Sequence, residues 1–167
     1  MNILILQLRL KIADLMLQIL RLQTGKISNP DKRLVLYDVA RACIGKDMAP
    51  LENEYGCAEA VNAVFKKAFG REIGGGLSTF RMYPILRSDK TFQPVLSPLP
   101  GDIIISPTGY GNGNLSNGHV GIVGENETIL SNTSVNGLWL SNFTISSWKE
   151  KYVYGGGFPM AYFRVVA

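Results

Sequence analysis

The stretch YGCAEAVNAVFKKAFG, residues 55–70, decides the fold, together with PGDIIIS at 100–106 and GHVGIV at 118–123. The first stretch carries apolar residues at helical spacing, which predicts a helix over 56–69 that ends at Gly70. These apolar residues are Ala60, Val61, Val64, Phe65 and Ala68. The other two stretches are short and rich in β-branched residues, as is typical of strands. A helix therefore precedes a sheet.

The remaining elements follow the same order along the chain. Apolar residues at helical spacing predict a helix over 33–44, which closes at Gly45, and a short helix over 77–83 with Pro84 as its stop. After residue 100 come four β-rich runs separated by Gly, Asn and Ser, at 103–106, 119–123, 128–134 and 160–166. Helices followed by an antiparallel sheet predict an α+β fold.

The first 24 residues, MNILILQLRLKIADLMLQILRLQT, predict an additional amphipathic helix. Ile and Leu alternate in a seven-residue repeat, which is the pattern of a coiled coil: Ile5, Leu8, Ile12, Leu15, Ile19 and Leu22. A second apolar line, Ile3, Leu10 and Leu17, runs along roughly the opposite face. We expect residues 1–24 to form a homo-oligomer, to dock on the core or to contact a membrane surface. Residues 25–31 (GKISNPD) are predicted to be a linker into a catalytic domain at 32–167.

Charges inside this segment bear on where the protein acts. Arg9, Lys11 and Asp14 interrupt the apolar run, whereas a signal peptide places its charges before the run. The same charges would each cost about 2.5–3.5 kcal/mol at the centre of a membrane span. The segment is therefore predicted to be no conventional signal peptide, and we assign no compartment.

Composition indicates one globular domain with an anionic partner. Of the 167 residues, 46% are hydrophobic and 18% are charged, which excludes a disordered chain. The net charge of +4 favours anionic partners such as bacterial cell wall, nucleic acid or acidic membranes. Because the basic residues are scattered along the chain, we expect no nucleic-acid interface.

The chain has two cysteines, Cys43 and Cys57, and one histidine, His119. This set is too small for a disulfide scaffold or a protein-ligated zinc site, so we expect neither metal nor cofactor. Cys43 falls on the apolar side of its helix and is predicted to be a small buried residue.

Cys57 is predicted to lie in the first turn of its helix, where the helix dipole stabilises a thiolate. A cysteine at such a position is by itself more often structural than catalytic. His119 opens a strand that packs against this helix, so the imidazole and the thiol can come within hydrogen-bond reach, as nucleophilic catalysis requires. Gly56 permits close approach of a substrate, and the first-turn amides can donate to an oxyanion.

A histidine base also needs an acceptor on its second nitrogen. Asn132 is our candidate, because it lies on the strand that follows His119, and adjacent strands can place two side chains on one face. Asp102 and Glu59 are the rivals. Asp102 is expected rather to cap a turn, and Glu59 to interact with the helix dipole.

The order YGCAEAVNAVF, PGDIII, GHVGIV, ILSNTS resembles that of the NlpC-type and CHAP-type cysteine peptidases and amidases, over residues 54–133. The resemblance implies a papain-like domain that hydrolyses an amide bond of peptidoglycan peptides through an acyl-enzyme. It further implies that Cys57 is the nucleophile, His119 the base and Asn132 the third polar member, with Gly101-Asp102 in the turn before the sheet. Gly56-Cys57-Ala58 is closer to the CHAP type than to the Asp-Cys-Ser of the NlpC type.

Aromatic residues are candidates for substrate binding. Tyr55 is predicted to help build a pocket for the substrate amine, as a tyrosine does in some members of that family, with packing as its alternative role. Trp139 and Trp148 are candidates for stacking on sugar rings, again with core packing as the alternative. Two other functions stay open: a non-catalytic wall-binding or assembly module with the same fold, and a phage-encoded lysis or tail protein, which would explain the missing signal peptide.

Overall fold

The computed structural model describes Ile12, Met16 and residues 31–51, 56–113, 115, 117–134 and 136–167. The chain divides into two units, Met1–Asp31 and Lys32–Ala167. The predictions for the N-terminal segment, its linker and Tyr55 lie outside the described residues, except that Ile12 and Met16 are helical. Within the described part of the chain, no helix combines the length and the apolar character needed to cross a bilayer.

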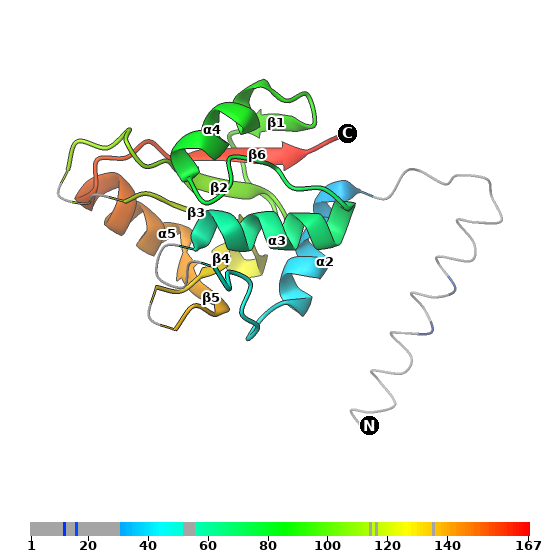
Figure 1. Ribbon diagram of the computed structural model, residues 1–167. Coiled ribbons are helices and arrows are strands. Elements are labelled where there is room, and N and C mark those ends of the chain that lie inside the picture. The colour runs from blue at the N-terminus through cyan, green and yellow to red at the C-terminus, as the bar shows by residue number, and fades with distance from the viewer. Residues whose placement is uncertain are drawn as a thin grey trace. The chain divides into compact units, whose positions relative to one another are not determined.

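The second unit is built on one antiparallel sheet of six strands in the order β1-β6-β2-β3-β4-β5 (Figure 1). Neighbouring strands pair antiparallel throughout. The strands are β1 (Phe92–Val95), β2 (Ile103–Ser106), β3 (His119–Val123), β4 (Thr128–Asn132), β5 (Trp139–Thr144) and β6 (Ala161–Val165). The helical elements are α2 (Lys32–Ala42), α3 (Cys57–Phe69), α4 (Thr79–Ser88), η1 (Glu125–Glu127), α5 (Ile145–Trp148) and η2 (Lys149–Gly155). The α+β prediction is confirmed.

The two faces of the sheet have separate apolar cores. One face packs against α2, α3 and α4, and alternate residues of β3 and β4 point into it, among them Val120, Ile122 and Leu130. The other face packs against α5 and η2, and Val123 and Ile129 point into it. Because successive residues of a strand point to opposite faces, a shift of one residue along β3 or β4 moves a side chain from one core to the other.

Helix α3 lies across the sheet as its sequence predicts. Val61 and Val64 are completely buried, and Phe65 packs against Phe92 of β1 with ring centroids 5.6 Å apart. Gly70 adopts a left-handed conformation with φ of 75°, and its N–H donates to the carbonyl of Lys66. These contacts anchor the helix, and its first residue, Cys57, lies near the backbone of Val120 at the start of β3.

Helix α4 differs from its prediction because it continues through Pro84 to Ser88. A proline inside a helix removes one backbone hydrogen bond and normally destabilises the helix. The next turn brings Leu86 into the core beside Met82, and both side chains are completely buried. Burying a leucine stabilises by about 1.5–3 kcal/mol, which offsets the missing hydrogen bond.

Candidate active site

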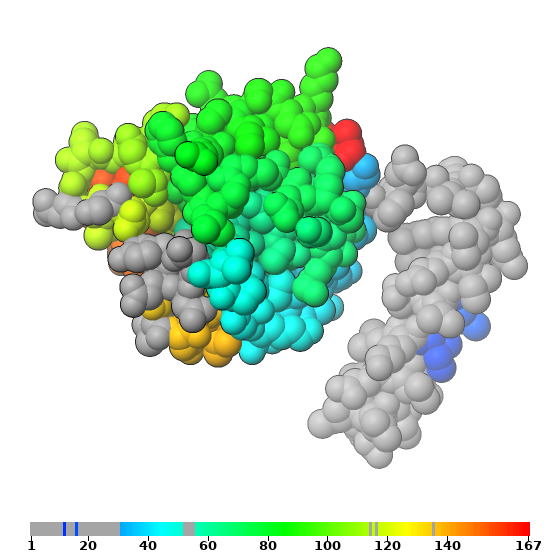
Figure 2. Space-filling view, viewed as in Figure 1, coloured from blue at the N-terminus to red at the C-terminus, as the bar shows by residue number. Residues whose placement is uncertain are grey.

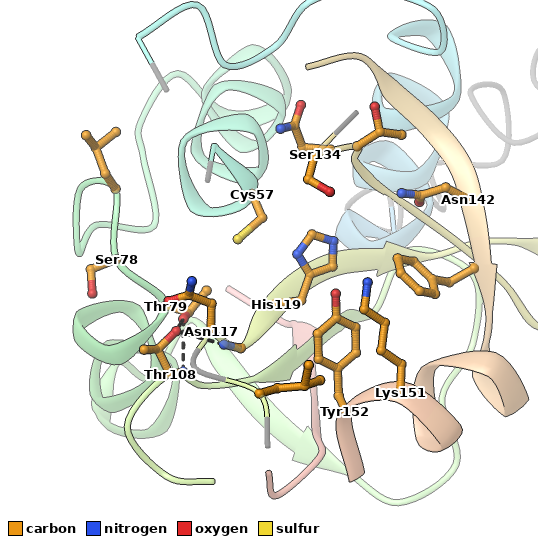
Figure 3. Close-up of a pocket in the computed structure, with 16 residues that line it drawn as sticks. Cys57, Ser78, Thr79, Thr108, Asn117, His119, Ser134, Asn142, Lys151 and Tyr152 are labelled. Atoms are coloured by element: carbon orange, nitrogen blue, oxygen red, sulfur yellow. Dashed lines mark hydrogen bonds between the residues drawn. The ribbon is translucent and has the colours of Figure 1, made fainter. Parts of the chain in front are cut away.

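A cleft of about 830 Å³ opens where α3, the start of β3, the ends of β4 and β5, and η2 meet. Its described lining includes Cys57, His119, Asn132 and Tyr152 (Figure 3). The cleft therefore brings together the predicted nucleophile, the predicted base and the predicted third member. No group of three His, Cys, Asp or Glu side chains within the described residues is arranged to hold a metal ion.

Cys57 is the first residue of α3, directly after Gly56 at the N-cap. Gly56 has φ of −73° and ψ of 15°, and its carbonyl accepts from the N–H of Ala60 at 2.8 Å. Cys57 and His119 both line the cleft (Figure 3). The helix start thus places the sulfur in the same cleft as the imidazole.

Burial favours the protonated form of the Cys57 thiol. Burial raises the pKa of Cys57 to about 11, and backbone hydrogen bonds from Val120, Ala58 and Cys57 itself offset this only in part. The helix start alone would lower this pKa, so its direction is opposite to the one that the position of Cys57 in the sequence suggests. The side chain is 9% exposed, so loss of hydration outweighs the stabilisation that the helix start offers to a thiolate.

His119 is held at the start of β3 by close backbone packing. Gly118 before it lies so near the carbonyl of Ser106 that a Cβ at this position would overlap it. The N–H of Gly118 donates to Oγ1 of Thr108 at 2.9 Å, and Thr108 in turn bonds to Thr79 at the start of α4. The loop after β2 lies against this end of α4 (Figure 2), where the Phe80 and Tyr110 rings are 5.8 Å apart.

The Nε2 atom of His119 bonds to Oγ of Ser131 at 3.0 Å. The Ser131 hydroxyl donates its only proton to Oδ1 of Asn142 at 2.7 Å. Ser131 must then accept from His119, so the proton of the neutral ring resides on Nε2 and Nδ1 is left unprotonated. This tautomer leaves a basic nitrogen for the thiol of Cys57.

Ser131 occupies the position next to His119 Nε2 that we predicted for Asn132, and the sheet register explains the difference. Ile122 of β3 pairs with Leu130 of β4, so His119 and Ser131 share one face while Asn132 points to the other. Asn132 lines the cleft from the side of α3. The geometry therefore favours Ser131, one residue away on the same strand, as the partner of His119 Nε2.

Asn142 reaches Ser131 because β5 contains a bulge. Ile129 pairs with Phe143 and Leu130 pairs with Ser141, so Asn142 is an extra residue between these two pairs. A bulge turns the side chain of its extra residue away from the regular alternation, and bulges are common beside active sites. The linear sequence carries no signal for this irregularity.

Three aromatic rings surround the His119 imidazole. Tyr152 stacks on it at 5.4 Å with an interplanar angle of 12°, and Phe143 and Trp148 lie at 5.7 and 5.2 Å. Burial, and secondly the positive charge of Lys151, lower the pKa of His119 to about 3. The imidazole is therefore neutral at neutral pH, as a general base must be.

Tyr152 extends from η2 with its hydroxyl pointing into the cleft near Cys57 and His119 (Figure 3). Burial, and secondly the nearby Cys57, raise the pKa of Tyr152, so the phenol keeps its proton. Short π-helical segments such as η2 are frequent at functional sites. We did not predict Tyr152, because KEKYVYG shows no periodicity that assigns its side chain to the cleft.

The other predicted residues lie elsewhere. Trp139 is completely buried and donates from Nε1 to the carbonyl of Ala40 at 2.9 Å, so its assignment to substrate binding was wrong. Trp148 is also completely buried, and it donates to Oγ of Ser106 at 3.0 Å. These two tryptophans support the sheet and offer no ring to a sugar.

The rivals of Asn132 are also placed outside the cleft lining. Asp102 is completely buried and accepts two hydrogen bonds from Arg164, at 2.9 and 2.7 Å. Glu59 accepts from the N–H of Leu51 at 3.1 Å. Cys43 is 3% exposed in the core, as predicted.

Comparison with known proteins yields a structural relationship only. No protein-family model matches the chain, and no curated protein shows significant sequence similarity to it. A similar fold occurs in the crystal structure of the type VI native effector-immunity complex Tae3-Tai3 from Ralstonia pickettii. That match has a TM-score of 0.51 and 16% sequence identity, and it covers 80% of this chain and 98% of that chain. At this level of sequence identity, the match shows a similarity of fold and does not show a shared function.

Proposed function

We propose that the unit Lys32–Ala167 is a papain-like cysteine hydrolase that cleaves an amide bond of bacterial cell-wall peptides. The observation that carries this proposal is the chain of hydrogen bonds from His119 through Ser131 to Asn142. It supports the proposal because, with Ser131 as acceptor, Nδ1 is unprotonated and can take a proton from Cys57. The wall-peptide substrate comes from the order of the motifs around Cys57, Asp102 and His119.

The first half of the reaction forms an acyl-enzyme. His119 Nδ1 removes the thiol proton as Sγ of Cys57 attacks the carbonyl carbon, so the reaction starts from a neutral pair. The imidazolium that forms keeps its Nε2–H bonded to Ser131. The backbone N–H of Cys57 and the phenol of Tyr152 donate to the oxyanion. Collapse of the tetrahedral intermediate breaks the C–N bond, and His119 returns the proton to the leaving amine.

The second half regenerates the enzyme. His119 Nδ1 removes a proton from water, whose oxygen attacks the thioester carbon. The C–S bond then breaks, the carboxylic product leaves, and the thiolate recovers its proton from His119. In each half of the reaction, His119 takes up one proton and releases it again, and the proposed mechanism uses no cofactor.

The relationship to an effector–immunity complex suggests a role for a second protein. A protein that binds over the cleft would block access to Cys57 without altering the site.

The alternative function is a non-catalytic wall-binding module. Such a module would bind peptidoglycan equally well with Cys57 or with alanine at that position.

Digestion of purified peptidoglycan, followed by mass spectrometry of the soluble fragments, tests the proposal. We expect wild type to release fragments with one new amine and one new carboxyl group, and Cys57→Ala to release none. Sacculus binding measured in parallel separates a hydrolase from a binding module. Undegraded sacculi that bind both proteins equally would reject the hydrolase.

A further inference from the structure

The described lining of the cleft carries one formal charge. Lys151 of η2 is the only Lys, Arg, Asp or Glu in it, and the remaining side chains are neutral or apolar, including the neutral imidazole of His119. A described lining with one cation and no anion favours a substrate with a negative group.

The ammonium group of Lys151 is held over two rings. Its Nζ lies 5.3 Å from the ring centroid of Phe143 and 5.3 Å from that of Tyr152. The second of these rings stacks on His119. Cation–π contacts fix the position of the charge while leaving its hydrogen-bond donors available.

Four basic side chains of this unit have carboxylate partners: Arg41, Lys66, Arg71 and Arg164. Lys66 pairs with Glu72 at 3.3 Å, and Arg164 pairs with Asp102 at 2.7 Å. No carboxylate of the described residues lies within ion-pair distance of Lys151, whose side chain is exposed. Because Lys151 also lines the cleft, its ammonium group is placed to contact a bound substrate.

We propose that Lys151 forms a subsite for a free carboxylate of the substrate, and that the enzyme prefers wall peptides with that carboxylate over the same peptides in which it is a primary amide. This inference rests on the proposed function and names its substrate class. The positive charge of Lys151 is felt at His119, so the bound carboxylate lies close to the reacting amide. It also partly neutralises the ammonium group and makes proton transfer to the imidazole easier.

The test uses synthetic wall peptides that differ only in their carboxylates, each replaced in turn by a primary amide. We expect the kcat/KM of wild type to be at least about tenfold higher for one carboxylate peptide than for its amide, since a charge-assisted hydrogen bond is lost. Lys151→Gln should reduce this preference to below about twofold, and Lys151→Arg should retain most of it. Lys149→Gln, which changes a lysine of η2 outside the cleft lining, should keep the preference.

Two results would overturn the subsite. One is a wild type that cleaves every carboxylate peptide and its amide equally well. The other is a preference that survives in Lys151→Gln. If wild type cleaves no peptide, the proposed function fails, and calorimetric binding of the same pairs to Cys57→Ala then decides on the subsite. Preferential binding of a carboxylate peptide that depends on Lys151 supports it, and equal binding or none rejects it.

Discussion

The two walls of the cleft differ in how they are encoded. The first wall, formed by α3 and the start of β3, supplies Cys57 and His119 from compact sequence motifs. The second wall, formed by β5 and η2, supplies Asn142, Lys151 and Tyr152 from segments without a recognisable motif. In the proposed mechanism, the first wall carries the reacting atoms, while the second wall orients the base, donates to the oxyanion and supplies the positive charge of the cleft. Substitutions in one wall should therefore remove the reacting groups, and substitutions in the other wall should remove the groups that orient and stabilise them.

The largest effect is expected in the first wall. Cys57→Ala and His119→Ala should each lower kcat on the order of 10⁴-fold, because each removes a bond-making or proton-transferring group. The double variant should be hardly slower than either single variant, since the two act as one unit. Cleavage rates of a wall peptide measure this. Cys43→Ala, a change in the core, is the control and should retain its activity.

In the second wall, Tyr152→Phe should lower kcat by about 100-fold with little change in KM. The variant keeps the ring that stacks on His119 and loses only the hydroxyl proposed to donate to the oxyanion. Steady-state kinetics separates the two parameters. A rise in KM at unchanged kcat would instead place the phenol in substrate binding.

A smaller loss is expected from the hydrogen bonds behind His119. Ser131→Ala and Asn142→Leu should each lower kcat about 10- to 50-fold. Ser131→Ala removes the acceptor of the His119 ring, and Asn142→Leu removes the group that holds the Ser131 hydroxyl in its accepting orientation. Asn142→Asp keeps an acceptor oxygen and should recover most of the activity. If Asn132→Ala loses more activity than Ser131→Ala, then the assignment from the sheet register is wrong.

These variants also show what the sequence predicts and what it cannot. Helix periodicity and glycine ends locate α3, and hence Cys57, because local physics determines them. Ser131 and Asn142 depend on the register between β3 and β4 and on a bulge in β5, both of which are set by pairing between distant segments. The burial of Trp139 has the same origin, since its partner Ala40 is 99 residues away. The alternation of side chains along a strand separates the residues of the two sheet faces, but it does not predict which of the two faces contacts His119.

The smallest effect concerns stability in acid. Burial lowers the pKa of His119 to about 3, below the value of about 6.5 in an unfolded chain. Between these values the unfolded chain binds a proton that the folded site excludes, so the free energy of unfolding decreases as the pH falls from about 6.5 towards 3. Denaturant unfolding over this range should show a shallower decrease for His119→Gln, which cannot titrate. Parallel curves for both proteins would mean that the imidazole is accessible to protons in the folded state.

The central claim is that Cys57 attacks the amide carbonyl and carries the acyl group. Acid quenching of the enzyme during turnover of a wall peptide, followed by intact-mass and peptide mass spectrometry, tests it most directly. We predict a mass increase equal to the acyl fragment, located on the peptide that contains Cys57, and no such increase in Cys57→Ala. An acyl group on another residue, or cleavage that continues in Cys57→Ala, would contradict the account.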